Sequence, residues 1–132
     1  MNAFIIAGKD RPGELADVAE AIAERGVNVE NAACLTWSGQ GAIGIVTNDD
    51  AATRSVLASR GFGYREVELV MCTLDDKPGT LAAAARKLAA AGVNVELVLP
   101  TGMSGDKVSV AFGTNDPARA RTALGEMAMA HA

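Results

Sequence analysis

Two short loops carry the residues whose types and spacing favour ligand chemistry. The segments are Asp10-Arg11-Pro12-Gly13-Glu14-Leu15 and Asp76-Lys77-Pro78-Gly79-Thr80-Leu81, and each follows a β-rich run and precedes residues at helical spacing. A helix N-terminus presents N–H groups that have no intrahelical acceptor, together with a partial positive charge, so a carboxylate binds there readily. A glycine beside that terminus leaves room for a ligand to approach the backbone. Both loops are therefore candidate anion-binding sites.

Two asparagines add to this chemistry, since Asn28 and Asn94 each follow closely on a glycine that is expected to end a helix. An asparagine side chain offers donors and an acceptor, so it can contact both the carboxylate and the ammonium of an amino acid. A purely structural explanation is also open. In it, Asp10 and Asp76 only cap helices, the loop glycines allow close packing, and the asparagines satisfy turn backbone.

The remaining reactive residue types do not predict catalysis. Cys34 and Cys72 match no metal-ligand spacing and lie in β-like apolar segments, where small buried side chains are expected. His131, the single histidine, lies in a terminal tail that gives a catalytic base no fixed partner. Glu66 and Glu68 are two residues apart on one strand, which predicts a solvated strand face. The sequence thus predicts a protein that is not an enzyme, with no cofactor and no metal site.

The elements that position the loops recur in a fixed order of strand, helix, strand, turn, strand and helix. The expected strands are 3–7, 28–36, 42–47, 67–73, 94–99 and 108–114. The first helix of each set is expected to begin at Pro12 or Pro78, with Leu15 or Leu81 on its apolar side. The second helices are expected over 51–60 and 117–129, with Asp50 and Asp116 as their N-caps. A further strand through 62–67 completes the first set. The order β-α-β-β-α-β predicts an α+β fold of the ferredoxin-like plait type, an antiparallel sheet with two helices on one face.

The order occurs twice because the sequence repeats itself. Segment 10–16 corresponds to 76–82, and Gly-Val-Asn-Val-Glu at 26–30 recurs unchanged at 92–96, in both cases 66 positions later. This predicts a duplication, with one domain over 1–66 and the other over 67–132. Only the three residues 130–132 follow the last expected helix, so the fourth strand of the second domain is expected to be missing or borrowed, from the run 62–74 or from a partner chain.

These motifs resemble those of the ACT domain family. The pattern is a strand, Asp-x-Pro-Gly-x-Leu opening a helix, and Gly-Val-Asn-Val opening the next strand, and the chain carries it twice, as in stand-alone tandem (two-domain) members. The resemblance implies tandem ACT-like plaits that form a non-catalytic, allosteric regulatory module. Such a module binds a small ligand, an amino acid above all, at domain or subunit interfaces. The ligand-binding residues that the resemblance implies are Asp10, Arg11, Pro12, Gly13, Glu14, Leu15, Asn28, Val29, Asp76, Lys77, Pro78, Gly79, Thr80, Leu81, Asn94 and Val95.

The composition of the chain indicates which classes of partner it can bind. The formal charge of −4 argues against a nucleic-acid surface and against an anionic membrane surface, because both need a basic face. No apolar run approaches the roughly 20 residues that span a bilayer. Cys34 and Cys72 are far apart and are expected to be small buried side chains, which favours the reducing cytosol, so a cytoplasmic protein is expected. An unpaired sheet edge and the lone Trp37 at a strand end favour association, most simply as a homodimer, with a regulated enzyme as a further partner. The alternative is an adaptor that uses the same fold for protein–protein contacts without a ligand.

Overall fold

The computed structural model describes residues 1–129, and within them six antiparallel strands and four α-helices form an α+β fold. The chain divides into two compact units, Met1–Val67 and Glu68–Ala132. None of the helices in the described range is long and apolar enough to cross a membrane.

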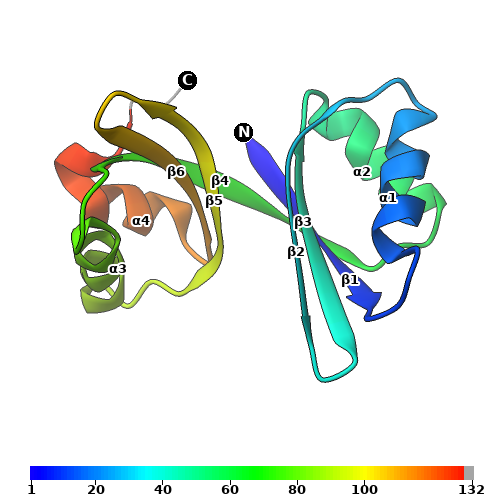
Figure 1. The fold of residues 1–132 in the computed structure, drawn as a ribbon, viewed down its shortest axis with the longest axis horizontal. Coiled ribbons are helices and arrows are strands. Elements are labelled where there is room, and N and C mark those ends of the chain that lie inside the picture. The colour runs from blue at the N-terminus through cyan, green and yellow to red at the C-terminus, as the bar shows by residue number, and fades with distance from the viewer. Residues whose placement is uncertain (130–132) are drawn as a thin grey trace. The chain divides into compact units, whose positions relative to one another are not determined.

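The first unit contains a sheet with the strand order β2-β3-β1-β4 and two helices on one of its faces (Figure 1). Its elements are β1 (Asn2–Lys9), α1 (Glu14–Ala23), β2 (Val29–Trp37), β3 (Gln40–Thr47), α2 (Asp50–Ser59) and the first part of β4 (Tyr64–Asp75). The central β1 pairs antiparallel with β3, with Phe4 opposite Ile45 and Ile6 opposite Ile43. These four side chains lie in the core with Val18, Ile22, Val56 and Leu57 of the helices.

The second unit has the strand order β4-β6-β5 and again two helices. Its elements are the rest of β4, α3 (Thr80–Ala90), β5 (Val95–Ser104), β6 (Lys107–Thr114), α4 (Pro117–Leu124) and the 3₁₀ helix η1 (Gly125–Met127). After η1, Ala128 forms a single antiparallel bridge with Cys72, and the backbone N–H of Met129 donates to the carbonyl of Met71 over 2.9 Å. The described tail therefore meets the side of β4 that β6 leaves open, with one bridge in place of a full strand.

Helix starts differ from the sequence-based expectation in two places. The cap of α2 is Asp49 and not Asp50: the Asp49 carboxylate accepts a hydrogen bond from the N–H of Ala52 over 3.0 Å. Pro12 and Pro78 do not occupy the first helical position, because α1 and α3 begin two residues later. The expected cap Asp116 is confirmed, and its carboxylate accepts from the N–H of Arg119.

Gly13 and Gly79 are themselves the caps of α1 and α3, with φ of 95° and 92°. This left-handed conformation is cheap for glycine and costly for other residues, so the backbone alone accounts for both glycines. The last expected helix was too long, since α4 ends at Leu124 and Gly125 has a φ of 58°.

Three side chains lie in environments that the sequence did not predict. Cys72 is fully buried as expected, but Cys34 is exposed. Leu15 and Leu81 face solvent, 48% and 52% exposed, although their spacing placed them on the apolar sides of their helices. Both lie in the first turn of their helices, and the buried residues of α1 and α3 lie in later turns.

Candidate functional site

A pocket of about 490 Å³ lies at the loop between β4 and α3 in the second unit. Four of the predicted ligand-binding residues line it: Lys77, Pro78, Gly79 and Thr80. The rest of its wall consists of residues that sequence reasoning did not select, namely Thr73, Leu74, Asp75, Ala83, Lys107, Glu126 and Met127. The fold thus gathers the end of β4, the start of α3, the start of β6 and η1 around one hollow.

Two lysines bring positive charge to this pocket. Asp75 and Lys107 are cross-strand partners in β4 and β6 and form an ion pair. The hydrogen bond from Lys107 lowers the pKa of the Asp75 carboxyl, and the same bond raises the pKa of Lys107. Nζ of Lys77 lies 3.9 Å from the other Asp75 oxygen. Two ammonium groups and the carboxylates of Asp75 and Glu126 thus line the pocket, so it offers partners to an anionic group and to a cationic group.

The Thr80 hydroxyl has a local role in the same loop. Its Oγ1 donates to the carbonyls of Asp75, over 2.7 Å, and Lys77, over 3.1 Å. These bonds hold the loop against the helix start. The backbone N–H groups of the first turn of α3 are consequently presented from a fixed loop.

The corresponding loop of the first unit is closed by its own side chains. Arg11 donates through Nε to Glu14 and through a terminal nitrogen to Asp17, each over 2.9 Å. These bonds raise the pKa of the Arg11 guanidinium, with the Asp17 bond as the largest cause. Oε2 of Glu14 lies 3.2 Å from the point where a Cβ on Gly8 would stand. Carboxylates of the chain therefore occupy the region at the start of α1.

The two loops differ at the positions that close the first one. In the second unit the residues at the places of Arg11, Glu14 and Asp17 are Lys77, Thr80 and Ala83. Neither threonine nor alanine carries a charge that could hold Lys77 against the helix. The second loop is therefore the more open of the two, which agrees with the position of the pocket.

Four of the predicted residues, Asn28, Val29, Asn94 and Val95, lie away from the loops of their own unit. Asn28 and Asn94 are exposed, and their backbone N–H groups donate to the side chains of Asn48 and Asn115 over 3.0 and 2.9 Å. Since α1 and α3 separate them from the loops, each lies a helix length away, roughly 15 Å. Asn28 and Val29 are therefore not in contact with the β1–α1 loop of their own unit. Asn94 and Val95 are likewise distant from the β4–α3 loop of theirs.

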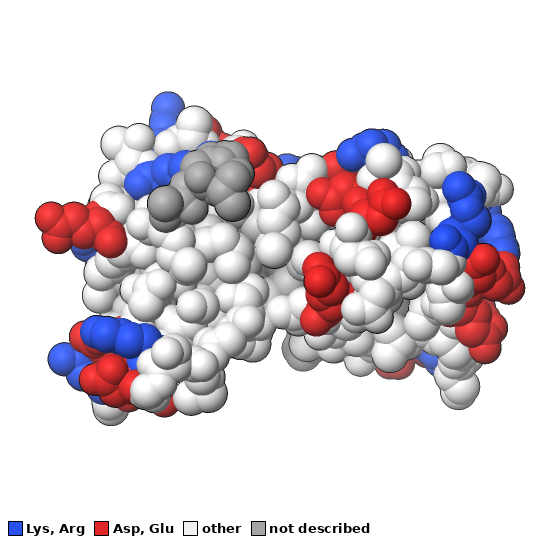
Figure 2. Space-filling view, turned by 90° about the horizontal axis from the view of Figure 1, so that it is seen from above, with Lys and Arg blue, Asp and Glu red and all other residues white. Residues whose placement is uncertain are grey.

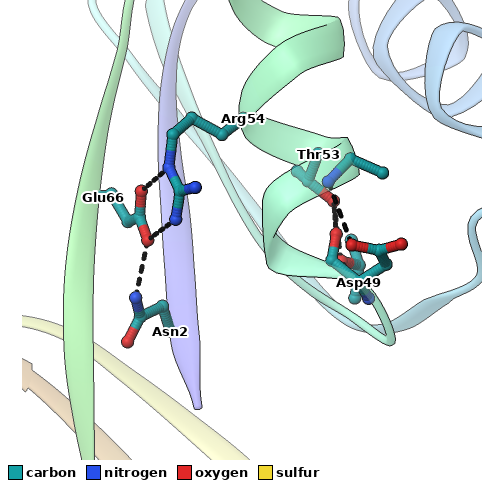
Figure 3. A network of polar contacts seen from close by, with 7 residues as sticks. Asn2, Asp49, Thr53, Arg54 and Glu66 are labelled. Atoms are coloured by element: carbon teal, nitrogen blue, oxygen red, sulfur yellow. Dashed lines mark hydrogen bonds and ion pairs between the residues drawn. The ribbon is translucent and has the colours of Figure 1, made fainter.

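Several charged side chains outside the pocket pair with one another. Figure 2 shows basic and acidic side chains interspersed on the face in view. In the first unit, Glu66 accepts two hydrogen bonds from Arg54 over 2.7 and 2.8 Å and one from Asn2 over 2.6 Å (Figure 3). The Arg54 bond is the main cause of the lowered pKa of Glu66. Glu66 is thus part of an ion-pair network, where a solvated carboxylate was expected.

A smaller hollow of about 260 Å³ lies at the β2–β3 hairpin of the first unit and is lined by Leu35, Trp37, Gln40, Gly41 and Ala42. Within residues 1–129, no group of three or more acidic, cysteine or histidine side chains is placed to hold a metal ion. His131 lies outside the described residues.

No protein family and no curated protein matches this chain in sequence. Solved structures do match in fold. A protein from Bacteroides thetaiotaomicron is 19% identical over 93% of this chain and 85% of its own, with a TM-score of 0.73. The regulatory subunit of aspartate kinase from Thermus thermophilus, in a ligand-free form, is 22% identical over 93% of this chain and 87% of its own, with a TM-score of 0.61. A structure of aspartokinase alpha and beta subunits has the same identity and coverage, with a TM-score of 0.64. At these identities, the likeness establishes the fold alone.

Proposed function

We propose that the chain consists of two ACT-like plaits in tandem and serves as a non-catalytic regulatory module. The fold likeness to regulatory subunits of aspartate kinase supports this class of function. Support for the duplication comes from structural features that recur 66 or 67 positions apart. Leu15 and Leu81 are both the second residue of an exposed first turn, and Thr47 and Thr114 accept from the N–H of Asp49 and Asp116 over the same 3.2 Å.

The pocket at the β4–α3 loop carries the proposal of a ligand site. It combines the N-terminus of an 11-residue helix with Lys77 and Lys107, so it suits the carboxylate of a small ligand. Asp75 and Glu126 in the same wall can accept from an ammonium group. A compound with both groups, an α-amino acid, fits this lining best.

We further propose that one amino acid binds per chain, at the second loop. In the first loop Glu14 and Asp17 already pair with Arg11 and lie at the start of α1. The carboxylate of a ligand would therefore be repelled by two carboxylates of the chain. Asn94 and Val95, distant from their own loop, would contribute if a second copy of the chain brought them to it. Binding would then couple to the homodimer and to a regulated enzyme.

The test is to transfer the closing residues from one loop to the other. Wild-type protein should bind at least one of the twenty amino acids in calorimetric titration, with one site per chain. The double variant Thr80→Glu with Ala83→Asp reproduces the first loop in the second, and should weaken that binding at least tenfold, because two carboxylates then compete for Lys77 and the helix start. The reciprocal variant, Glu14→Thr with Asp17→Ala, should leave the binding in place.

A matched control separates a local effect from added charge. Ala85→Glu with Ala89→Asp adds the same two charges to exposed positions further along α3 and should bind as the wild type does. If none of the twenty amino acids binds to folded wild-type protein, the ligand proposal fails and the adaptor function takes its place. If the Thr80→Glu, Ala83→Asp variant binds the amino acid as tightly as the wild type does, the ligand does not bind at this loop.

A further inference from the structure

The segment that follows α4 forms one wall of the pocket at the β4–α3 loop. Gly125, with its φ of 58°, turns the chain out of α4 into η1, and Glu126 and Met127 of η1 both line the pocket. The backbone N–H of Ala128 donates to the carbonyl of Gly125 over 3.1 Å, and Ala128 also forms the bridge to Cys72. Glu126 and Met127 are therefore held between two fixed points of the backbone.

The direction of this bridge places η1 beside the end of β4. The bridge is antiparallel, so the residues before Ala128 lie alongside the residues after Cys72. In β4 these are Thr73, Leu74 and Asp75, and all three line the pocket. The pocket is thus enclosed by the end of β4 and by η1 as well as by the β4–α3 loop, and the loop motif accounts for only part of its wall.

An apolar wall, formed by Leu74, Ala83 and Met127, connects the pocket with the core of the second unit. Leu74 is 5% exposed and belongs to that core, and Met127 packs against the core, yet both also line the pocket. Ala83 adds a methyl group from α3 to the same lining. An apolar group of a ligand would contact this wall and leave water, which favours its binding.

Four charged side chains line the pocket, and three of them form ion pairs with one another. Asp75 pairs with both Lys107 and Lys77. The structure gives the fourth, Glu126, no ion pair with any residue in the range 1–129. Two lysines share one carboxylate, so one positive charge remains for the carboxylate of a ligand. The negative charge of Glu126 remains for an ammonium group.

We propose that η1 completes the ligand site and that the site selects an α-amino acid with an uncharged, apolar side chain. The inference rests on the ligand site proposed above and names its ligand class. Glu126 accepts hydrogen bonds from the ammonium group, the carboxylate lies against Lys77, and the side chain contacts the apolar wall. Each charge of the ligand then has an opposite charge beside it, while Asp75 keeps its two lysines.

The same arrangement disfavours other classes of amino acid. The two positive and two negative side chains of the pocket cancel, and so do the carboxylate and the ammonium of the ligand. A third charge, on the ligand side chain, would lie against the apolar wall without a partner, and taking an unpaired charge out of water is unfavourable. Glycine would leave the apolar wall without a contact. The pocket volume of 490 Å³ falls in the range of about 300–1,000 Å³ that small-molecule sites have, so a large apolar side chain fits.

The amino group of the ligand gives a direct test of Glu126, with leucine as the probe. In calorimetric titration Glu126→Gln should weaken leucine binding about tenfold, because a hydrogen bond between two charged groups is lost. Isocaproate, which is leucine without its amino group, should displace leucine equally well from the wild type and from Glu126→Gln. Glu20→Gln removes the same charge from an exposed position on α1 and should bind leucine as the wild type does.

Met127 tests the apolar wall. The wild type should bind leucine at least about tenfold more tightly than glycine, as expected for burial of an apolar side chain of that size. Met127→Ala should reduce this ratio severalfold, and Met127→Leu should retain it. Because Met127 also packs against the core, circular dichroism must show that both variants are folded. The ratio compares two ligands on one protein, so a general loss of folded protein leaves it unchanged.

Failure of this inference and failure of the proposed function give different results. If folded wild-type protein binds none of the twenty amino acids, both fail. If the Thr80→Glu, Ala83→Asp variant weakens binding but Glu126→Gln does not, the loop is the ligand site and η1 is not part of it. An equal loss of leucine and isocaproate binding in Glu126→Gln contradicts the contact with the amino group. A wild type that binds glutamate, lysine or glycine at least as tightly as leucine overturns the ligand class.

Discussion

Glu66 lies on β4 two residues before Glu68, and its environment follows from chain segments that are distant in sequence. Arg54 on α2 and Asn2 on β1 both donate to its carboxylate (Figure 3). A side-chain spacing of two along one strand predicts only that Glu66 and Glu68 share a face. The partners depend on which helix packs beside that face.

Replacement of Glu66 should reveal a pH-dependent contribution to stability. Glu66→Gln should lower the free energy of unfolding at pH 7 by about 1 kcal/mol, because charge-assisted bonds from Arg54 are lost. A carboxyl with a lowered pKa contributes stability above its unfolded pKa of about 4.3 and loses it as the pH falls through the folded pKa. The difference between variant and wild type in urea denaturation should therefore shrink as the pH drops below about 4.

The control for this prediction is Glu20→Gln, an exposed carboxylate on α1, which should show little difference at either pH. A Glu66→Gln deficit that is the same at pH 3 and pH 7 would argue that packing, and not charge, explains it.

At the scale of the element, the start of α2 depends on Asp49. Asp49→Ala should cost about 1 kcal/mol of unfolding free energy, since the N–H of Ala52 loses its acceptor. Asp50→Ala is the matched control and should cost less, because Asp50 lies within the helix and acts only through its charge near the N-terminus. Thermal unfolding at neutral pH would rank the two, and a larger loss for Asp50→Ala would contradict the assigned cap.

The caps of α1 and α3 allow a similar prediction. Gly79→Ala should destabilise the protein by roughly 1 kcal/mol, since alanine must adopt a φ near 92°. A Cβ on Gly79 would have no described neighbour within 4 Å, so this loss comes from the backbone and not from a clash. An unchanged urea midpoint would contradict the left-handed cap. Any glycine variant used to probe the ligand site therefore needs its stability measured as well.

At the scale of the molecule, each unit has a core of its own, built from its sheet and its two helices. Ile22→Ala and Leu88→Ala, one in each core and both fully buried, should each cost about 2–5 kcal/mol in urea denaturation. Leu81→Ala, at an exposed position in the first turn of α3, should cost far less. Similar losses for Leu81→Ala and Leu88→Ala would show that the exposed face of α3 is covered in solution.

The sequence by itself determined the order of strands and helices, the two loops and the repeat, because hydrophobic periodicity, proline and glycine act over a few neighbouring residues. The tertiary structure decided which loop is open. The Asp75–Lys107 pair arises from strand register, and the closure of the first loop by Glu14 and Asp17 arises from the turn that places Arg11 beside α1. Cys34 has the β-like apolar context of a buried residue, but its exposure is set by where β2 lies in the sheet. Register, packing partners and edge position depend on residues far apart in the chain, and local pattern carries no information about them.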